Sequence, residues 1–103
     1  MQPIISLITI TFNSQETIQS TLDSIFNQSF QDFEHIIIDG GSSDNTLNII
    51  ENHDIKTSKL ISEKDNGIYD ALNKGIRESK GRYIGILHSE DIFFSNETLN
   101  LIS

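Results

Sequence analysis

The chain contains no cysteine, no tryptophan and a single proline among its 103 residues. The lack of cysteine excludes disulfides, thiolate metal ligands and a cysteine nucleophile, and it suits a reducing compartment. We therefore expect a cytoplasmic chain, with any membrane association encoded downstream of it. No run approaches the roughly 20 apolar residues that a membrane-spanning helix needs. The first residues also lack the positive charge that precedes the apolar stretch of a signal peptide.

Basic residues are scarce as well. The chain has 7 Lys and Arg against 15 Asp and Glu, which makes the formal net charge -8, and the basic residues form no cluster. Proteins that bind nucleic acid through its phosphates normally present a basic patch, so nucleic acid is not an expected partner. A bound diphosphate would need its charge offset by something other than Lys and Arg, and a carboxylate-bound metal ion can do this.

Hydrophobic residues make up 36% of the chain and alternate between two patterns. Short apolar β-branched runs predict strands, and apolar residues three or four positions apart predict helices. The expected strands are Ile4–Phe12, Phe33–Ile38, Lys59–Ser62 and Arg82–Leu87. The expected helices are Ser14–Gln28, Asn45–Asn52, Gly67–Ser79 and a last one that Asn96 opens and that runs to the end of the chain.

Three details of these helices are specific enough to test. Ser14 has the residue type and position of an N-cap for the first helix. Ile68, Leu72 and Ile76 form one apolar stripe on the third helix, with Ala71 beside it. Gly81 is expected to end that helix in the left-handed conformation.

Strands that alternate with helices predict an α/β fold with a mostly parallel sheet covered on both faces. In such sheets, ligands bind at the carboxyl ends of the strands. Polar residues gather at all four of these ends. They are Thr11, Asn13 and Ser14 after the first strand, Asp39 to Asp44 after the second, Glu63 to Asn66 after the third, and His88 to Asp91 after the fourth.

Each acidic candidate has a structural and a functional interpretation. Asp39 either forms the turn before two glycines or accepts a hydrogen bond from a bound base or ribose. Asp65 is either an ordinary loop residue or a ligand contact, and Asp70 either belongs to a solvated ion-pair face or contacts the ligand. Glu90 and Asp91 either form an acidic turn before another element or hold Mg2+ or Mn2+, which prefer oxygen ligands.

Four segments together resemble the nucleotide-binding half of the family 2 glycosyltransferases, which have a GT-A type fold. They are Ile8–Asn13, Ile36–Thr46, Glu63–Gly75 and Gly81–Asp91. The resemblance covers essentially the whole chain and implies a Rossmann-like sheet in the order 3-2-1-4. It also implies transfer of a sugar, with inversion, from a nucleotide-diphosphate sugar, which in many members is a UDP-sugar. The acceptor would be a saccharide or a lipid-linked molecule, as in polysaccharide biosynthesis.

The resemblance assigns roles to individual residues. Thr11 would border the nucleoside, Asp39 would recognise the base and Asp65 would approach the nucleoside from the third loop. The segment from His88 to Asp91 lies where the family carries its Asp-x-Asp metal motif. The implied substrate-binding residues are Thr11, Asn13, Asp39, Asp65, Asp70, His88 and Ser89, and the implied ligands of a divalent cation (Mn2+ or Mg2+) are Glu90 and Asp91.

Two departures from the family pattern stand out. His88 and Glu90 replace the usual Asn or Asp and Asp, and the Glu side chain is one methylene longer. The chain also ends soon after this motif, before the acceptor-binding region and the catalytic base. We therefore expect residues 1–103 to form a donor-binding portion, with Tyr83–Leu87 as an unpaired apolar edge that favours self-association.

Two other functions are compatible with a small acidic α/β chain. The first is a non-catalytic nucleotide-binding or regulatory module with a degenerate metal site, which the replacements at His88 and Glu90 favour. The second is a phospho-acceptor signalling domain. That domain needs acidic residues directly after its first strand and a lysine at a late strand end, whereas here Phe12 and Asn13 follow the first strand and Lys74 lies within a helix.

Overall fold

The computed structural model describes residues 3–29, 32–55 and 57–88. Strands and helices alternate along this part of the chain, as predicted. The strands are β1 (Ile5–Thr11), β2 (Phe33–Asp39), β3 (Lys59–Ser62) and β4 (Tyr83–His88), and the helices are α1 (Ile18–Phe26), α2 (Thr46–Asn52) and α3 (Ile68–Glu78). The helix expected after Asn96 lies outside the described residues.

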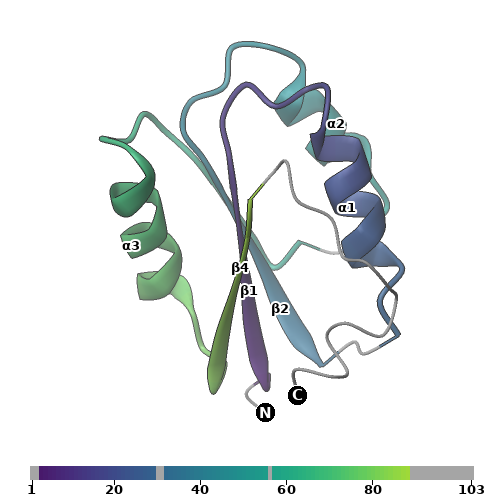
Figure 1. The fold of residues 1–103 in the computed structure, drawn as a ribbon, viewed down its shortest axis with the longest axis vertical. Helices are drawn as coiled ribbons and strands as arrows, with labels where there is room; N and C mark the ends of the chain where they lie inside the picture. The colour runs from purple at the N-terminus through teal and green to yellow at the C-terminus, as the bar shows by residue number, and fades with distance from the viewer. Residues whose placement is uncertain (1–2, 30–31, 56, 89–103) are drawn as a thin grey trace.

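The four strands form one parallel sheet in the order β3-β2-β1-β4 (Figure 1), which confirms the predicted order. In the register of the sheet, Ile8 of β1 pairs with Ile36 of β2 and with Ile86 of β4. At the carboxyl end, Thr11 pairs with Asp39. The ends of β1 and β2 therefore lie side by side and place their following loops on the same rim.

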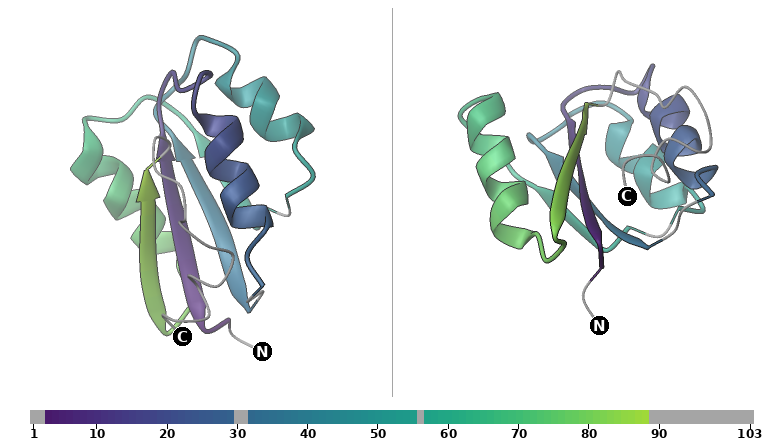
Figure 2. Two further views of the ribbon diagram at one scale, coloured as in Figure 1. Left: turned by 45° about the vertical axis from the view of Figure 1, so that its right-hand side comes forward. Right: turned by 60° about the horizontal axis from the view of Figure 1, so that its bottom comes forward.

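Helices cover both faces of the sheet: α1 and α2 lie on one face and α3 on the other (Figures 1 and 2). Alternate residues of the strands supply the two cores because successive side chains of a strand point to opposite faces. Ile37 packs with Ile18 and Leu22 of α1, whereas Ile8 packs with Ala71 of α3. These buried side chains hold the helices to the sheet through the hydrophobic effect.

Helix α3 contacts the sheet through its smallest residues rather than through the predicted stripe. Its buried residues are Ala71 and Gly75. A Cβ atom added at Gly75 would lie 2.6 Å from Cγ2 of Ile8, so the helix approaches too closely for a larger side chain there. Ile68 and Ile76 of the predicted apolar stripe are instead 47% and 45% exposed, so the helix packs through Ala71, beside the stripe, and through Gly75.

Helix α1 begins four residues later than predicted, and Ser14 is not its N-cap. The backbone oxygen of Ser14 accepts hydrogen bonds from the N–H groups of Thr17 and Ile18, at 3.0 and 2.9 Å, and closes a turn ahead of the helix. The N-cap is Thr17, which makes no side-chain capping bond. The Ser14 N–H donates to Thr46 Oγ1 at 2.8 Å, so this residue serves the contact between two loops.

The predicted role of Gly81 was also wrong. Helix α3 ends with Ser79 in an extended conformation, and within the described residues only Gly41 and Gly67 are glycines with positive φ. Gly81 instead lies against β1, where an added Cβ would come within 2.5 Å of the Ser6 nitrogen. The glycine is needed for this close approach of two backbones rather than for a left-handed turn.

Strand β4 forms one edge of the sheet within the described residues. It pairs with β1 on one side. Its side chains Tyr83, Ile84 and Ile86 are 54%, 45% and 46% exposed. The predicted apolar edge is therefore present in this structure. Within the described part of the chain, no helix is long and apolar enough to cross a membrane.

Candidate functional site

A cavity of about 490 Å³ opens at the carboxyl ends of β1, β2 and β3. This is the edge at which parallel α/β sheets bind their ligands. Its lining comes from the loops that follow the three strands and consists of Phe12, Gly40, Gly41, Lys64, Asp65 and Gly67. Among the predicted substrate-binding residues that the structure describes, Asp65 is the one that lines it.

Gly40 lies between two walls of this cavity, Phe12 and Asp65. A Cβ atom added at Gly40 would lie 3.0 Å from Asp65 Oδ2 and 3.3 Å from Cδ1 of Phe12. Asp65 and Phe12 therefore approach each other across a backbone that carries no side chain. A larger residue at position 40 would push these two walls apart or fill the space between them.

Phe12 is a site residue that the sequence analysis missed. Its side chain is 59% exposed, although it directly follows the last residue of a buried strand. An aromatic ring held open to solvent at a strand end offers an apolar face to a planar ligand. The signal was present in the sequence as an aromatic residue at the ligand-binding end of β1, within the segment Ile8–Asn13.

The loops after β1 and β2 are joined by side-chain hydrogen bonds and lie together at the top of Figure 1. Asn13 adopts a positive φ of 47°, a conformation that Asn tolerates better than most residues. Its N–H donates to Ser42 Oγ at 2.8 Å, and its Oδ1 accepts from the Ser43 N–H at 2.8 Å. The predicted residue Asn13 thus fixes the rim of the site and does not line the cavity.

Asp44 adds a second connection between the same loops. Its carboxylate accepts hydrogen bonds from the N–H and the hydroxyl of Thr46, at 2.9 and 2.5 Å, and from the Gln15 N–H at 3.3 Å. Partial burial alone would raise the pKa of the Asp44 carboxyl, but these hydrogen bonds lower it below its ordinary value. The charged form therefore holds the start of α2 against the loop that leads into α1.

Asp39 is fully buried at the end of β2 and organises the loop that follows it. Its Oδ2 accepts from the N–H groups of Gly41 and Ser42, at 3.0 and 2.8 Å, and from Ser62 Oγ at 2.8 Å. Its Oδ1 accepts from Ser42 Oγ at 2.5 Å. The structure thus shows Asp39 in the turn-forming role, with a further bond that connects β2 to β3.

Thr11, Asp70 and His88 are predicted substrate-binding residues that do not line the cavity. Thr11 is 2% exposed, and its Oγ1 has no hydrogen-bond partner within the described part of the chain. Asp70 Oδ2 accepts from the Asn66 N–H at 2.9 Å and lies 3.7 Å from Lys74 Nζ, so it supports the β3–α3 loop. His88 is the last residue of β4 and is half-buried.

Lys74 reinforces the same loop from helix α3. Its Nζ lies 3.3 Å from Glu63 Oε1 and 3.4 Å from the Lys64 backbone oxygen. Lys64 is the basic residue in the lining of the cavity.

The predicted metal ligands Glu90 and Asp91, together with Ser89, lie outside the described residues. Within residues 3–29, 32–55 and 57–88, no group of three or more His, Asp or Glu side chains could hold a metal ion.

The sheet order and the helices on both faces match a GT-A type fold. The structure of Staphylococcus aureus TarS 1-349 in complex with UDP-GlcNAc superimposes with a TM-score of 0.86 and 28% sequence identity, over 96% of this chain and 30% of that one. The sequence model of the family described as Glycosyl transferase family 2 matches residues 6–102. The chain belongs to this family, which confirms the resemblance seen in the sequence.

Two relatives show how much of a family member the chain represents. It is 39% identical over 92 residues to the uncharacterized glycosyltransferase Rv1514c of Mycobacterium tuberculosis, covering 88% of this chain and 35% of the relative. It is 35% identical over 102 residues to the Escherichia coli UDP-Glc:alpha-D-GlcNAc-diphosphoundecaprenol beta-1,3-glucosyltransferase WfaP, covering 96% and 40%. The chain thus spans two fifths or less of the length of these relatives.

Proposed function

We propose that this chain is the donor-binding portion of a glycosyltransferase and that its donor is a UDP-sugar. The observation that carries the proposal is the cavity between Phe12 and Asp65 at the carboxyl ends of the strands, in a chain that belongs to glycosyl transferase family 2. Two similar proteins support the choice of nucleotide, since WfaP is named for UDP-Glc and TarS was solved with UDP-GlcNAc.

The lining suggests how the nucleoside would be held. The base would stack on the exposed ring of Phe12, as planar groups do on aromatic side chains. Asp65 would accept a hydrogen bond from the base or the ribose, and the Gly40–Gly41 backbone would allow the ligand to approach closely. Thr11 and Asn13 would border the nucleoside through the first loop.

Base recognition by Asp39 is part of the same proposal. Because Asp39 has no exposed surface, a base could reach it only if the Ser42 hydroxyl gave way at Oδ1. A carboxylate oxygen has room for more than one hydrogen bond, so a base N–H could take the place of that hydroxyl. Otherwise Asp39 would act on the ligand through the Gly41 and Ser42 backbone that it holds.

We propose that the whole enzyme inverts the configuration of the transferred sugar. A carboxylate outside this chain would take the proton of an acceptor hydroxyl. The hydroxyl oxygen would then form a bond to the anomeric carbon as the bond from that carbon to the diphosphate breaks. Glu90 and Asp91 would hold a divalent cation, Mn2+ or Mg2+, which supplies positive charge to offset the diphosphate. His88 and Ser89 would lie beside the phosphates, and the acceptor would be a saccharide or a lipid-linked molecule.

Calorimetric titration of the chain with UDP tests the proposal directly. We expect UDP to bind more tightly than GDP or ADP, and more tightly with Mn2+ than without it. Phe12→Ala should weaken UDP binding by about tenfold or more, since loss of base stacking costs roughly 1–3 kcal/mol. Tyr83→Ala is the matched control, because Tyr83 is also an exposed aromatic residue but lies at the opposite end of the sheet. Equal affinity for the three nucleotides, or equal losses in both variants, would contradict the proposal.

The replacement at Glu90 favours a second candidate, a nucleotide-binding module without a working metal site. Titration of Glu90→Asp with UDP, with and without Mn2+, separates the two. If the native site holds a cation, Mn2+ will strengthen UDP binding in the native chain and in the variant. If only the variant responds to Mn2+, the native motif is degenerate and the chain is a binding module.

We also propose that strand β4 is an association surface when no other strand covers it. Its exposed side chains Tyr83, Ile84 and Ile86 lie along a strand that, among the described residues, pairs with β1 on one side and forms an edge of the sheet on the other. Edges of this kind pair readily with other chains.

A further inference from the structure

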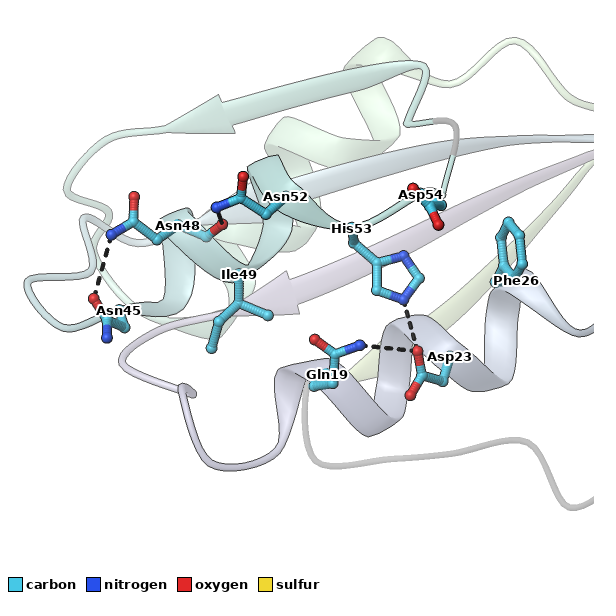
Figure 3. Close-up of a pocket in the computed structure, with 9 residues that line it drawn as sticks. All are labelled: Gln19, Asp23, Phe26, Asn45, Asn48, Ile49, Asn52, His53 and Asp54. Atoms are coloured by element: carbon cyan, nitrogen blue, oxygen red, sulfur yellow. Dashed lines mark hydrogen bonds and ion pairs between the residues drawn. The ribbon is translucent and has the colours of Figure 1, made fainter.

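A groove of about 400 Å³ lies between helices α1 and α2, outside the site described above. Helices α1 and α2 lie on the face of the sheet opposite α3 (Figure 1), and Figure 3 shows the residues that line the groove. Its lining includes four side-chain amides, Gln19, Asn45, Asn48 and Asn52, together with the ring of Phe26. Its volume falls in the range of small-molecule sites in proteins, which is about 300–1,000 Å³.

The four amides present unused hydrogen-bonding groups from both sides of the groove, three from α2 and its N-cap and one, Gln19, from α1. On α2, Asn48 Nδ2 donates to Asn45 Oδ1 at 3.3 Å, and Asn52 Nδ2 donates to the Asn48 backbone oxygen at 2.8 Å. On α1, Gln19 Nε2 donates to Asp23 Oδ1 at 3.0 Å. Within the described residues, Asn45 Nδ2, Asn48 Oδ1, Asn52 Oδ1 and Gln19 Oε1 have no partner. Each amide NH2 group also keeps at least one N–H that no described residue accepts, so the groove offers both donors and acceptors, which suits a ligand rich in hydroxyl groups.

Phe26 supplies an apolar wall at one end of the groove, as Figure 3 shows. Its ring is 51% exposed and meets His53 edge-on, with the ring centroids 5.9 Å apart and the planes at 79°. His53 Nε2 is in turn 2.7 Å from Asp23 Oδ1, which connects the two helices. The aromatic ring is thus held in place while part of its surface stays open to a ligand.

The charge of the lining limits the class of ligand. Among the described residues, the groove is lined by the carboxylates of Asp23 and Asp54 and by no Lys or Arg. A phosphate or nucleotide would be repelled by this lining, so the groove does not extend the donor site. A neutral ligand with many hydroxyl groups and an apolar ring face fits both the amides and Phe26.

We propose that the groove between α1 and α2 binds a neutral pyranose, either as a free sugar or as one unit of a saccharide chain. The hydroxyl groups donate to the amide oxygens of Asn48, Asn52 and Gln19, and the apolar face of the ring packs on Phe26. This site is additional to the proposed donor site and does not depend on it.

Nuclear magnetic resonance titration of the 15N-labelled chain tests the proposal, with methyl glucoside and cellotetraose as probes. We expect either probe to shift the side-chain amide signals of Asn45, Asn48 and Asn52, with dissociation constants in the millimolar range (roughly -4 kcal/mol). Shifts with both probes show that one sugar is sufficient, and shifts with cellotetraose alone show that the site recognises a chain. No shift of these signals with either probe would overturn the proposal.

Substitutions of the lining residues test whether the shifts arise from binding in the groove. Phe26→Ala and Asn48→Ala should each weaken binding by about tenfold, which corresponds to about 1.4 kcal/mol. Tyr69→Ala should bind as the native chain does, because Tyr69 is an exposed aromatic residue on α3, across the sheet from the groove. The dispersion of the backbone signals shows whether each variant is folded. Should Phe26→Ala unfold, Asn48→Ala tests the same groove from the other helix. Binding unchanged in a folded Phe26→Ala or Asn48→Ala variant overturns the proposal.

The same titration with saturating UDP present distinguishes binding in the groove from binding at the proposed donor site. If the saccharide shifts persist with UDP present, the groove is a separate site, and displacement by UDP overturns the proposal. If UDP itself fails to bind while the saccharide shifts remain, the donor proposal fails and the groove proposal stands.

Discussion

At the scale of single residues, His35 is the most consequential buried polar group. It lies in the middle of the sheet, 1% exposed, with Nε2 2.8 Å from the Thr9 hydroxyl. Its Nδ1 has no hydrogen-bond partner within the described residues. Burial lowers the pKa of His35 to about 4 from its ordinary 6.5, with a smaller contribution from the charge of His53. The folded chain therefore holds this histidine neutral.

The low pKa of His35 makes stability depend on pH. The unfolded chain takes up a proton at His35 near pH 6.5 and the folded chain only near pH 4, so stability is lost as the pH falls through this range. We expect the free energy of unfolding to fall by about 2 kcal/mol between about pH 7 and pH 5. Urea denaturation at the two pH values measures this difference.

A variant with both partners replaced is the control for this prediction. Thr9→Val combined with His35→Leu removes the titrating group and its hydrogen-bond partner together, without leaving one of them unpaired. Its stability should change little over the same pH range. An equal fall in the native chain and in the double variant would assign the pH dependence to other groups.

At the scale of helices and strands, the sequence predicted most of the architecture. The four strands, their order and helices α2 and α3 agree with the structure to within one or two residues, because their apolar runs are clear. The start of α1 was missed because Ser14 is used in a turn and a loop contact, and neither leaves a periodic signal. The packing face of α3 was missed because periodicity cannot show how closely a helix approaches its sheet.

The candidate site was also predicted only in part from the sequence. The sequence correctly predicted polar residues at the carboxyl ends of the strands, where the cavity lies, and Asp65 does line the cavity. It did not distinguish the residues that line the cavity from those that hold the loops, such as Asp39 and Asn13, since that depends on hydrogen bonds between distant segments. Phe12 was not predicted as a site residue because the prediction rested on polar residues at the strand ends.

The packing of α3 predicts that a substitution at Gly75 destabilises the fold more than one at Ile76. Gly75→Ala should destabilise the fold by about 1–3 kcal/mol, because overpacking against Ile8 exceeds the helix-propensity gain of alanine. Ile76→Ala removes a half-exposed side chain and should cost less, about 1 kcal/mol or below. Denaturant midpoints of the two variants check the order, and a larger loss for Ile76→Ala would restore the stripe as the packing face.

At the scale of the whole molecule, the two edges of the sheet differ. Strand β3 is only four residues long, and Lys59 on it pairs with Glu78 of α3, so this edge is short and charged. Strand β4 is longer, and its exposed side chains are apolar. Short and charged edges resist pairing with other chains, whereas long apolar edges promote it.

We therefore expect this 103-residue chain to self-associate through β4. Light scattering across a range of concentrations should show a molar mass that rises above that of the monomer. The double substitution Ile84→Lys with Ile86→Lys should restore the monomer, because lysine on an edge strand opposes pairing. The matched substitution Leu60→Lys on β3 should leave the association unchanged. A native chain that stays monomeric at high concentration would exclude this surface.

The hydrogen bonds that join the loops after β1 and β2 have a consequence for the entropy of binding. Asn13, Ser42, Ser43 and Asp44 hold these loops in one arrangement before any ligand arrives. A ligand that binds at this rim restricts little loop motion, because the loops are already ordered. The loss of loop entropy therefore reduces its affinity less than it would in a flexible site. This side of the cavity therefore acts as a preorganised template for a ligand.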